Sequence, residues 1–504
     1  MAKRIAKELG LRTWRLLLVA AAGLLAGPTL PRADQWYLIF PAVAMMLLAV
    51  RGAKFLSAYG LGVVGGIFFY ASQSPWMTAY LGPVPWLALA TLQGLIFGLG
   101  LALSSLVFKH VKSVLLSAFL LASIWVAREW LAGHYPYGGY QWSRLAQTQA
   151  DTWLAKWAYF GGLSLVSFAV AFIAATALQL VLAKNRKQLI SISLVAVTVL
   201  GPLLILLPVG GNGTAVIAGI QGNADAGLFS DAKPGSNLNK QLLETLKASK
   251  DPEFSKVDFV VWPENASDLD PTRIPQAMAA VETLVNVYTK KPMLLGTVNW
   301  RGDEVFNTIL QYNPGEGQVD YYDKQRPVPF AEYVPDRDFW NLLAPDLIGL
   351  ITHGYSFGTK SGVFDIAGVK AGSLICFEIS IDDLMHKLIG EGAEVLISQA
   401  NNADFGQTDE TFQQVALVKL QAIATGRSIV HISTVGQSLV VHADGTVHES
   451  IKPFEPGYYI AEVPLSKTVT PADRFFGWVD YLALIVTIAF IVWVGFAKLR
   501  SKRE

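Results

Sequence analysis

The sequence contains a single cysteine, Cys376, in 504 residues. One thiol cannot form an intramolecular disulfide, so disulfide bonds within the chain are excluded as a source of stability. A lone thiol is either an inert, small core residue or a nucleophile, and composition alone does not decide between these two roles.

An excess of charge of either sign is also missing, because 40 Lys and Arg residues nearly balance 39 Asp and Glu residues, for a net charge of +1. Without a net basic field the chain has no general means of collecting phosphates, so nucleic acid is not expected as a partner. The seven histidines show no H-x-x-x-H spacing, and paired cysteines are absent. Neither a metal nor another cofactor is therefore predicted.

Charged residues are scarce altogether, at 16% of the chain, whereas apolar residues make up 52%. This balance is typical of membrane proteins. The apolar residues are concentrated on either side of a stretch, 209–475, that has the pattern of a soluble α/β domain. We predict a membrane domain with seven helices over 1–208, a soluble domain over 209–475, and a last membrane helix with a basic tail over 476–504.

A helix needs ~20 apolar residues to cross a bilayer core. Eight segments are predicted to do so, the first two being short: 14–27, 36–50, 55–74, 86–108, 113–132, 161–183, 188–208 and 477–498. The first of them also resembles a secretory signal, but an uncleaved span is favoured because further apolar segments follow at once.

Basic clusters mark the cytoplasmic ends of membrane helices. They occur as KRIAK (3–7), RGAK (51–54), KHVK (109–112), KNRK (184–187) and KLRSKRE (498–504). With eight spans, this distribution places both termini in the cytoplasm and the 209–475 domain on the opposite side of the membrane.

Two features of the membrane segments have more than one interpretation. The stretch GLGVVG (60–65) fits the G-x-G-x-x-G pattern, but it lies inside an apolar segment with no preceding strand. Close packing of membrane helices is therefore its predicted role. Arg128 and Glu129 close the fifth segment, where they are predicted either to contact a lipid head group or to extend along the helix to the interface.

Short strands alternate with helical patterns over 209–475, which is typical of a layered α/β architecture. The predicted strands are 215–220, 257–262, 293–298, 373–377, 394–398 and 428–433. The predicted helices lie around 236–249, 273–289, 380–390 and 408–425. The segments 306–313 and 318–324 flank the turn PGEG and predict an antiparallel hairpin, so the sheet is expected to be mixed.

Three polar residues follow predicted strands: Glu264 after VVWP, Lys324 after VDYYD and Cys376 after SLI. The carboxyl ends of strands are where the sites of α/β proteins gather. Singly, each residue has a structural explanation, as a turn glutamate, a solvated lysine or a core cysteine. Together they supply a base, a cation and a nucleophile, the minimum set for acyl transfer. A helix predicted to open near Ser380 would favour the thiolate through its dipole.

The segments VVWPEN, YYDKQRPVPFAEYVP and ICFEIS resemble the Glu–Lys–Cys motifs of the nitrilase (carbon–nitrogen hydrolase) superfamily. The PVPFAEYVP element, the pair Gly426–Arg427 and the membrane segments are similar, more narrowly, to the apolipoprotein N-acyltransferase family. This resemblance implies an αββα sandwich joined to a helical bundle in the bacterial cytoplasmic membrane. The sandwich is expected on the periplasmic or extracellular side.

By the same resemblance Cys376 is the nucleophile and Glu264 its general base, while Lys324 and the backbone N–H of Phe377 stabilise the oxyanion. Glu332 is implied to hold Lys324 and to bind the substrate, with a lid or surface salt bridge as the alternative.

A last family position is matched by Glu378, which is either a supporting residue of the site or a structural one.

The reaction implied by the family proceeds in two steps through a thioester on Cys376. A membrane phospholipid donates the acyl chain, and the α-amino group of the diacylglyceryl-cysteine at a lipoprotein N-terminus accepts it. A monomer embedded in membrane lipid is expected. Two other functions remain open: a membrane-tethered amidase that uses water, and a transporter or scaffold whose soluble domain binds a ligand. The membrane segments are nearly free of ionisable residues, which counts against transport.

Overall fold

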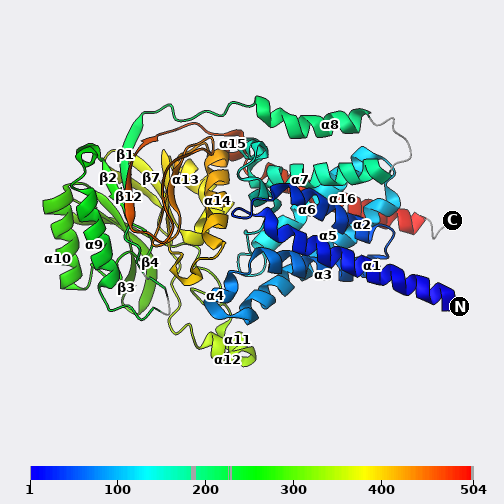
Figure 1. Cartoon of the computed structure of the whole chain (residues 1–504), viewed down its shortest axis with the longest axis horizontal. Coiled ribbons are helices and arrows are strands. Elements are labelled where there is room, and N and C mark those ends of the chain that lie inside the picture. Colours follow the sequence, from blue (N-terminus) through cyan, green and yellow to red (C-terminus); the bar gives the residue numbers. More distant parts are fainter. Residues whose placement is uncertain (1, 183–188, 225, 228–229, 501–504) are drawn as a thin grey trace. The chain divides into compact units, whose positions relative to one another are not determined.

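The computed structural model describes residues 2–182, 189–224, 226–227 and 230–500. The chain divides into two units, the first made of Met1–Leu206 with Arg474–Glu504 and the second of Leu207–Asp473. Figure 1 shows both units, with many of their helices and strands labelled. The basic cluster at 184–187 and the last four residues of the basic tail lie outside the described residues.

The first unit is helical. Its α-helices are α1 (Ala2–Ala26), α2 (Ile39–Val50), α3 (Phe55–Gln73), α4 (Met77–Leu81), α5 (Pro83–His110), α6 (Val114–His134), α7 (Ala158–Leu182), α8 (Leu189–Leu200) and α16 (Trp478–Arg500). Within the described residues, five helical segments are long and apolar enough to cross a membrane. They are Phe55–Gln73, Pro83–His110, Val114–His134, Trp153–Leu182 and Trp478–Arg500.

These five segments coincide with five of the eight predicted spans. The predicted spans 36–50 and 188–208 are occupied by shorter apolar helices, Trp36–Val50 and Ile190–Leu204. The predicted span 14–27 is the second half of the 25-residue helix α1. The structure therefore supports a multi-helix membrane unit, with five helices of spanning length among the residues described.

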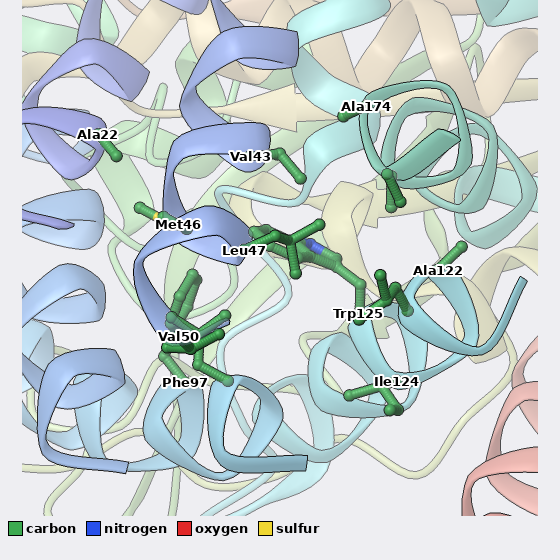
Figure 2. Close-up of a cluster of buried hydrophobic side chains, with 14 of the residues drawn as sticks. Ala22, Val43, Met46, Leu47, Val50, Phe97, Ala122, Ile124, Trp125 and Ala174 are labelled. Atoms are coloured by element: carbon green, nitrogen blue, oxygen red, sulfur yellow. The ribbon is translucent and has the colours of Figure 1, made fainter. Parts of the chain in front are cut away.

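Apolar side chains from α1, α2, α5, α6 and α7 form a continuous core in this unit (Figure 2). Close approach of α3 to its neighbours depends on glycine. A Cβ atom on Gly62 would lie 2.8 Å from the Cα of Gly98, and one on Gly65 would lie 3.2 Å from the Cβ of Val19. The predicted packing role of the GLGVVG stretch is thus confirmed, because side chains at these positions would separate the helices.

Arg128 and Glu129 do not extend to the surface, as they are only 6% and 7% exposed. The guanidinium of Arg128 donates to the hydroxyl of Tyr70 at 2.7 Å. Oε1 of Glu129 accepts hydrogen bonds from the indole of Trp125 and the backbone of Leu145, both at 3.0 Å. Both predictions for the pair, contact with a lipid head group and extension to the interface, are therefore wrong. The two side chains form hydrogen bonds inside the helical unit, and these bonds offset the cost of burying charged groups.

The second unit contains two six-stranded sheets, with the strand orders β12-β1-β2-β3-β4-β5 and β11-β10-β9-β8-β7-β6. The first sheet consists of β1 (Thr214–Gln221), β2 (Phe259–Val261), β3 (Met293–Arg301), β4 (Glu304–Asn313), β5 (Gly317–Asp323) and β12 (Gly457–Pro464). The second consists of β6 (Val363–Ile366), β7 (Val369–Ile375), β8 (Val395–Ala400), β9 (Ile429–Ser433), β10 (Ser438–Val441) and β11 (Val447–Ile451).

Helices cover the outer faces of the two sheets (Figure 1). They are α9 (Ser236–Ala248) and α10 (Pro275–Thr283) on the first sheet, and α13 (Asp382–Gly390) and α14 (Glu410–Thr425) on the second. One apolar cluster fills the space between the sheets, including Ile217 and Phe259 from the first and Ile397 and Val430 from the second. The layer order is αββα, as the family resemblance implied.

Strand pairing agrees with the predicted mixed sheet. β1 and β3 flank β2 in parallel, whereas β4 pairs with β5 as an antiparallel hairpin. The chain returns at the end of the unit to add β12 antiparallel to β1, a strand that the sequence analysis did not identify. Because β1 and β2 of one sheet are parallel, as are β7 and β8 of the other, the loops that follow each pair lie together at one edge of their sheet.

Candidate active site

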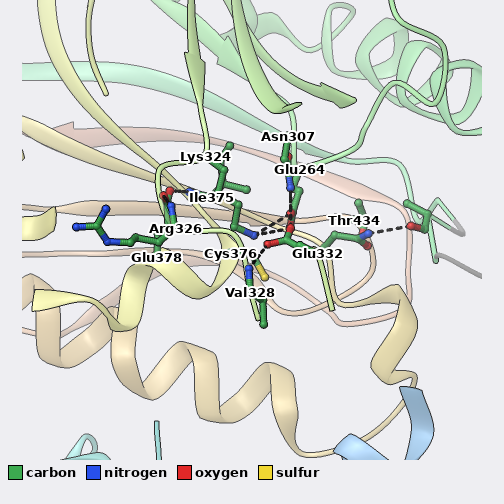
Figure 3. Close-up of polar contacts among 12 residues, drawn as sticks. Glu264, Asn307, Lys324, Arg326, Val328, Glu332, Ile375, Cys376, Glu378 and Thr434 are labelled. Carbon is green, nitrogen blue, oxygen red and sulfur yellow. Dashed lines mark hydrogen bonds and ion pairs between the residues drawn. The ribbon is translucent and has the colours of Figure 1, made fainter. Parts of the chain in front are cut away.

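Each of the three predicted residues follows a strand. Glu264 lies three residues after β2, and Lys324 directly after β5 of the same sheet. Cys376 directly follows β7 of the other sheet. Since the two sheets pack face to face, their loops bring the three residues into one cluster (Figure 3).

The polar centre of this cluster is a buried group of charges. The ammonium nitrogen of Lys324 lies 2.8 Å from Oε1 of Glu332 and 3.6 Å from Oε1 of Glu264. The side chains of Lys324 and Glu264 are 1% and 4% exposed. Oε2 of Glu332 accepts the backbone N–H of Val328 at 2.7 Å, which fixes its carboxylate. Of the two predictions for Glu332, the structure favours a partner that holds Lys324.

Asn307 of β4 is a member of this cluster that the sequence analysis missed. Its amide nitrogen donates to Oε1 of Glu264 at 2.7 Å and to Oε1 of Glu332 at 3.1 Å. Its backbone carbonyl accepts the N–H of Lys324 at 2.9 Å. Asn307 could have been recognised as a polar residue within a strand, β4, whose residues 305–312 are all buried. A buried amide needs partners, and here the partners are the carboxylates.

The environment of Glu264 favours its protonated form. Burial, joined by the negative charge of Glu332, raises the pKa of Glu264 to about 7, against the opposing effects of Lys324 and Asn307. The backbone N–H of Asn401 is a further hydrogen-bond donor to this carboxylate. A buried carboxyl group with a pKa near neutrality is suited to accept and return a proton.

Lys324 remains a cation in this site. Its burial opposes the charge, but Glu332 and Glu264 outweigh that effect and raise the pKa of Lys324. The ammonium group is therefore a permanent positive charge beside the sulfur, of the kind that stabilises a developing oxyanion.

Cys376 begins a short 3-10 turn, η8 (Cys376–Ser380), and has a φ of +53°. This left-handed conformation is uncommon for a residue with a side chain and recurs at functional sites. Burial raises the pKa of the Cys376 thiol well above its ordinary value, and the charge of Glu264 adds to this effect more than Lys324 opposes it. The helix predicted to open near Ser380 is α13, which begins at Asp382, six residues after Cys376, and a dipole effect on the thiol stays a prediction.

Phe377 follows the nucleophile candidate in the same turn, where its carbonyl accepts the hydroxyl of Ser380 at 2.8 Å.

Glu378 is fully buried and serves as a clamp between the two sheets. Oε1 accepts the backbone N–H groups of Gln325 at 2.8 Å and Arg326 at 3.0 Å, directly after Lys324. Oε2 accepts the N–H of Ile375 at 2.9 Å, directly before Cys376. Glu378 thus holds the lysine loop and the cysteine turn together, and a role in the reaction itself stays a prediction.

Glu378→Gln is expected to reduce the free energy of unfolding by ~1–3 kcal/mol, because the amide turns an N–H group toward buried N–H donors and leaves at least one unpaired. Thermal unfolding of the full chain measures this loss. Asp383→Asn is the matched control, since its exposed carboxylate meets Arg326 at 3.3 Å and such pairs contribute little. Equal melting temperatures for Glu378→Gln and the wild type would contradict the clamp.

Within the part of the chain that the structure describes, no group of three or more His, Cys, Asp and Glu side chains is placed to hold a metal ion. The cluster instead joins a thiol, a carboxylate of raised pKa and a fixed cation. These groups are able to carry out nucleophilic acyl transfer with proton exchange.

Comparison with known proteins finds related sequences for both the N-terminal and the C-terminal parts of the chain. The model of the apolipoprotein N-acyltransferase N-terminal domain matches residues 22–176, and the carbon–nitrogen hydrolase model matches residues 217–470. An apolipoprotein N-acyltransferase of Mycolicibacterium smegmatis is 30% identical over 93% of this chain and 83% of that protein. One from Vibrio parahaemolyticus is 25% identical over 91% of this chain and 92% of that protein. A solved amidase from Nesterenkonia sp. is similar at 15% identity and a TM-score of 0.39, over 51% of this chain and 92% of its own.

Proposed function

Because the chain belongs to the apolipoprotein N-acyltransferase family, we propose that it is a membrane acyltransferase that N-acylates lipoproteins. The acyl donor is a membrane phospholipid, and the acceptor is the α-amino group of the diacylglyceryl-cysteine at the lipoprotein N-terminus. The observation that carries this proposal is the buried contact of Lys324 with Glu264 and Glu332 beside Cys376. The protein needs no cofactor for this chemistry and acts as a monomer.

In the first step, the sulfur of Cys376 attacks the ester carbonyl carbon of the phospholipid while Glu264 accepts the thiol proton. The resting thiol is protonated, so this transfer must accompany the attack. The negative charge that develops on the carbonyl oxygen faces the ammonium of Lys324 and the backbone N–H of Phe377. Collapse of the intermediate breaks the carbon–oxygen bond, the lysophospholipid leaves with the proton held by Glu264, and a thioester remains.

In the second step, the α-amino nitrogen attacks the thioester carbon and passes one proton to Glu264. The same oxyanion contacts serve again. Collapse breaks the carbon–sulfur bond, the amide remains on the lipoprotein, and the proton of Glu264 returns to the sulfur of Cys376. The enzyme is thus restored after a ping-pong cycle, with Glu264 exchanging one proton in each half.

The substrates explain why such a site belongs to a membrane protein. Each acyl chain is held in the bilayer by about 0.8 kcal/mol per CH₂ group, so the enzyme must work at the bilayer surface. We propose eight spans, with α1 and the two shorter apolar helices completing the five long ones. The basic clusters then place both termini in the cytoplasm. The domain at 209–475 follows the membrane domain at 1–208 in the sequence and precedes the last helix and basic tail at 476–504. It faces the periplasm or the cell exterior.

Acylation of Cys376 is expected to rise with pH and to level off above about pH 7, the pKa to which burial and Glu332 raise Glu264. The base accepts a proton only when it is ionised, so below this pH the rate falls about tenfold per unit. Single-turnover acylation by labelled phospholipid measures the midpoint. In Glu332→Gln the midpoint should move down, because a neighbouring negative charge is lost. A rate that is flat between about pH 5 and 8 contradicts Glu264 as the base.

Reconstitution with a defined acceptor tests the proposed function. The full chain in phospholipid vesicles is given a diacylglyceryl lipopeptide with a free N-terminus, and the products are identified by mass spectrometry. We expect an N-acylated lipopeptide and one lysophospholipid for each amide formed. An N-acetylated lipopeptide is the control and should give no product. Hydrolysis of small amides without lipopeptide acylation would instead assign the chain as a membrane-tethered amidase.

A further inference from the structure

The sulfur of Cys376 has a polar partner that is not part of the Glu–Lys–Cys set. The side-chain amide nitrogen of Gln414, in α14, donates to the sulfur at 3.7 Å. Gln414 is fully buried. This contact places an N–H donor on the atom that carries the acyl group between the two steps of the proposed reaction.

The orientation of this amide is fixed by its neighbours. The amide nitrogen of Asn402 donates to Oε2 of Glu410 at 2.6 Å and to the side-chain oxygen of Gln414 at 3.0 Å. The oxygen of Asn402 accepts the hydroxyl of Ser433 at 2.5 Å. The hydroxyl of Ser433 holds the oxygen of Asn402, and this bond turns the Asn402 nitrogen toward Glu410 and Gln414. That nitrogen in turn holds the oxygen of Gln414, which directs the Gln414 nitrogen to the sulfur.

The members of this network are withdrawn from water, with exposed fractions of 3% for Glu410, 1% for Asn402 and 0% for Gln414. Burial raises the pKa of Glu410 to about 8, although its bond from Asn402 opposes the shift. Packing such groups beside a thiol is costly unless each is paired, and an apolar core would be cheaper. We therefore expect this buried polar network to act on the chemistry at the sulfur.

We propose that Gln414 is a further catalytic residue, which stabilises the thiolate of Cys376, and that Asn402 and Glu410 are positioning residues that aim its amide. The inference rests on the proposed function for the step in which it acts. When the amine displaces the enzyme, the carbon–sulfur bond breaks and its electron pair stays on the sulfur. The N–H of Gln414 then donates to that anion until the proton of Glu264 returns.

The charges around the sulfur explain why a neutral donor is useful there. Among the groups that act most strongly on Cys376, the carboxylates of Glu264, Glu410 and Glu332 disfavour the thiolate when ionised, whereas Lys324 favours it. A sulfur anion in this surrounding is disfavoured unless a hydrogen bond reaches it directly. An amide supplies that bond without adding another titratable group to the cluster.

The single cysteine makes a direct test possible, because alkylation by iodoacetamide reports on Cys376 alone. The rate of alkylation of the full chain in detergent is measured against pH for the wild type and Gln414→Met, which keeps the side-chain volume and removes the donor. We expect the inflection to move up by about one to two pH units in Gln414→Met, the effect of losing a hydrogen bond to a charged atom.

Gln421→Met is the matched control, since Gln421 lies on the same helix, is 2% exposed and donates to Asp382 at 2.8 Å, away from the sulfur. Its inflection should equal that of the wild type. An unchanged inflection in Gln414→Met, or an equal shift in both variants, overturns the proposal. If Gln414→Met does not accumulate, Gln414→Asn replaces it, because the shorter side chain draws the amide away from the sulfur and should give a shift of the same sign.

A second readout separates this proposal from the function on which it rests. Acyl-enzyme is formed from labelled phospholipid, and its decay on addition of lipopeptide is followed. We expect about a tenfold or greater slowing of decay in Gln414→Met, with none in Gln421→Met. Failure of the wild type to form acyl-enzyme would reject the proposed function, whereas normal formation with equal decay in all variants would reject only the role of Gln414.

Discussion

Replacing Cys376 with alanine is expected to abolish acyl transfer, with a loss of about 10⁴- to 10⁶-fold in rate. Cys376 is the only cysteine in the chain, and its sulfur lies within a cluster of Glu264, Lys324 and Gln414. Without the sulfur, the acyl chain has no covalent carrier. The base and the cation then face an empty position.

The measurement is lipopeptide N-acylation by the full chain in phospholipid vesicles, with thermal unfolding of the same preparations as the control. Cys376→Ala should unfold close to the wild-type temperature, because only one partly buried sulfur atom is removed. Cys376→Ser should form an oxyester that is handed on slowly, since a hydroxyl is a poorer nucleophile and leaving group than a thiol. A rate for Cys376→Ala within about tenfold of the wild type would contradict the thioester mechanism.

Lys324→Met should lower the rate by about 10²- to 10³-fold, the usual effect of removing one donor to an oxyanion. Lys324 is 1% exposed and lies between Glu264 and Glu332. Its loss leaves the buried carboxylate of Glu264 and the partly buried one of Glu332 without their cation, so the pKa of Glu264 should rise as well. The pH midpoint of acylation is then expected above its wild-type value of about 7.

The control for this variant is Lys360→Met. Lys360 forms an ion pair with Asp320, but its side chain is 40% exposed, and pairs of this kind contribute little. Lys360→Met should therefore keep the wild-type rate and pH midpoint. If both lysine variants lost activity equally, or if Lys324→Met stayed within about threefold of the wild type, the oxyanion role of Lys324 would be rejected.

The positions of the three central residues followed from the sequence because each follows a predicted strand, Lys324 and Cys376 directly and Glu264 after three residues. The strands carrying Glu264, Lys324 and Cys376 are β2, β5 and β7, and all three were predicted from local composition. Convergence at the ends of strands is a property of α/β sheets and needs no knowledge of side-chain contacts.

The residues that were missed depend on how the two sheets and their helices face each other. Asn307 reads as one polar position in a strand, and its contacts to Glu264 and Glu332 arise only through register. Gln414 occupies one face of a buried helix, where nothing in the periodicity separates a core amide from a donor to sulfur. The clamp role of Glu378 likewise requires the packing of one sheet against the other.

The membrane helices were predicted with less detail, because apolar runs report composition and length but not packing. The helix at 36–50 has the predicted bounds, whereas the one predicted over 188–208 covers Ile190–Leu204, and both are shorter than the five helices of spanning length. The predictions for Arg128 and Glu129, contact with a lipid head group or extension to the interface, depended only on their position near a helix end. The side chains turn inward instead, because Tyr70 and Trp125 offer hydrogen bonds there.

The most direct test of the account is to look for the acyl chain on the sulfur. The wild-type full chain is incubated with a phospholipid labelled in its acyl chain and no acceptor, and the peptide that contains Cys376 is analysed by mass spectrometry. The account predicts one acyl group on Cys376, removable by hydroxylamine and transferred to lipopeptide when that is added. Transfer to lipopeptide with no acyl group ever detectable on Cys376 would contradict it.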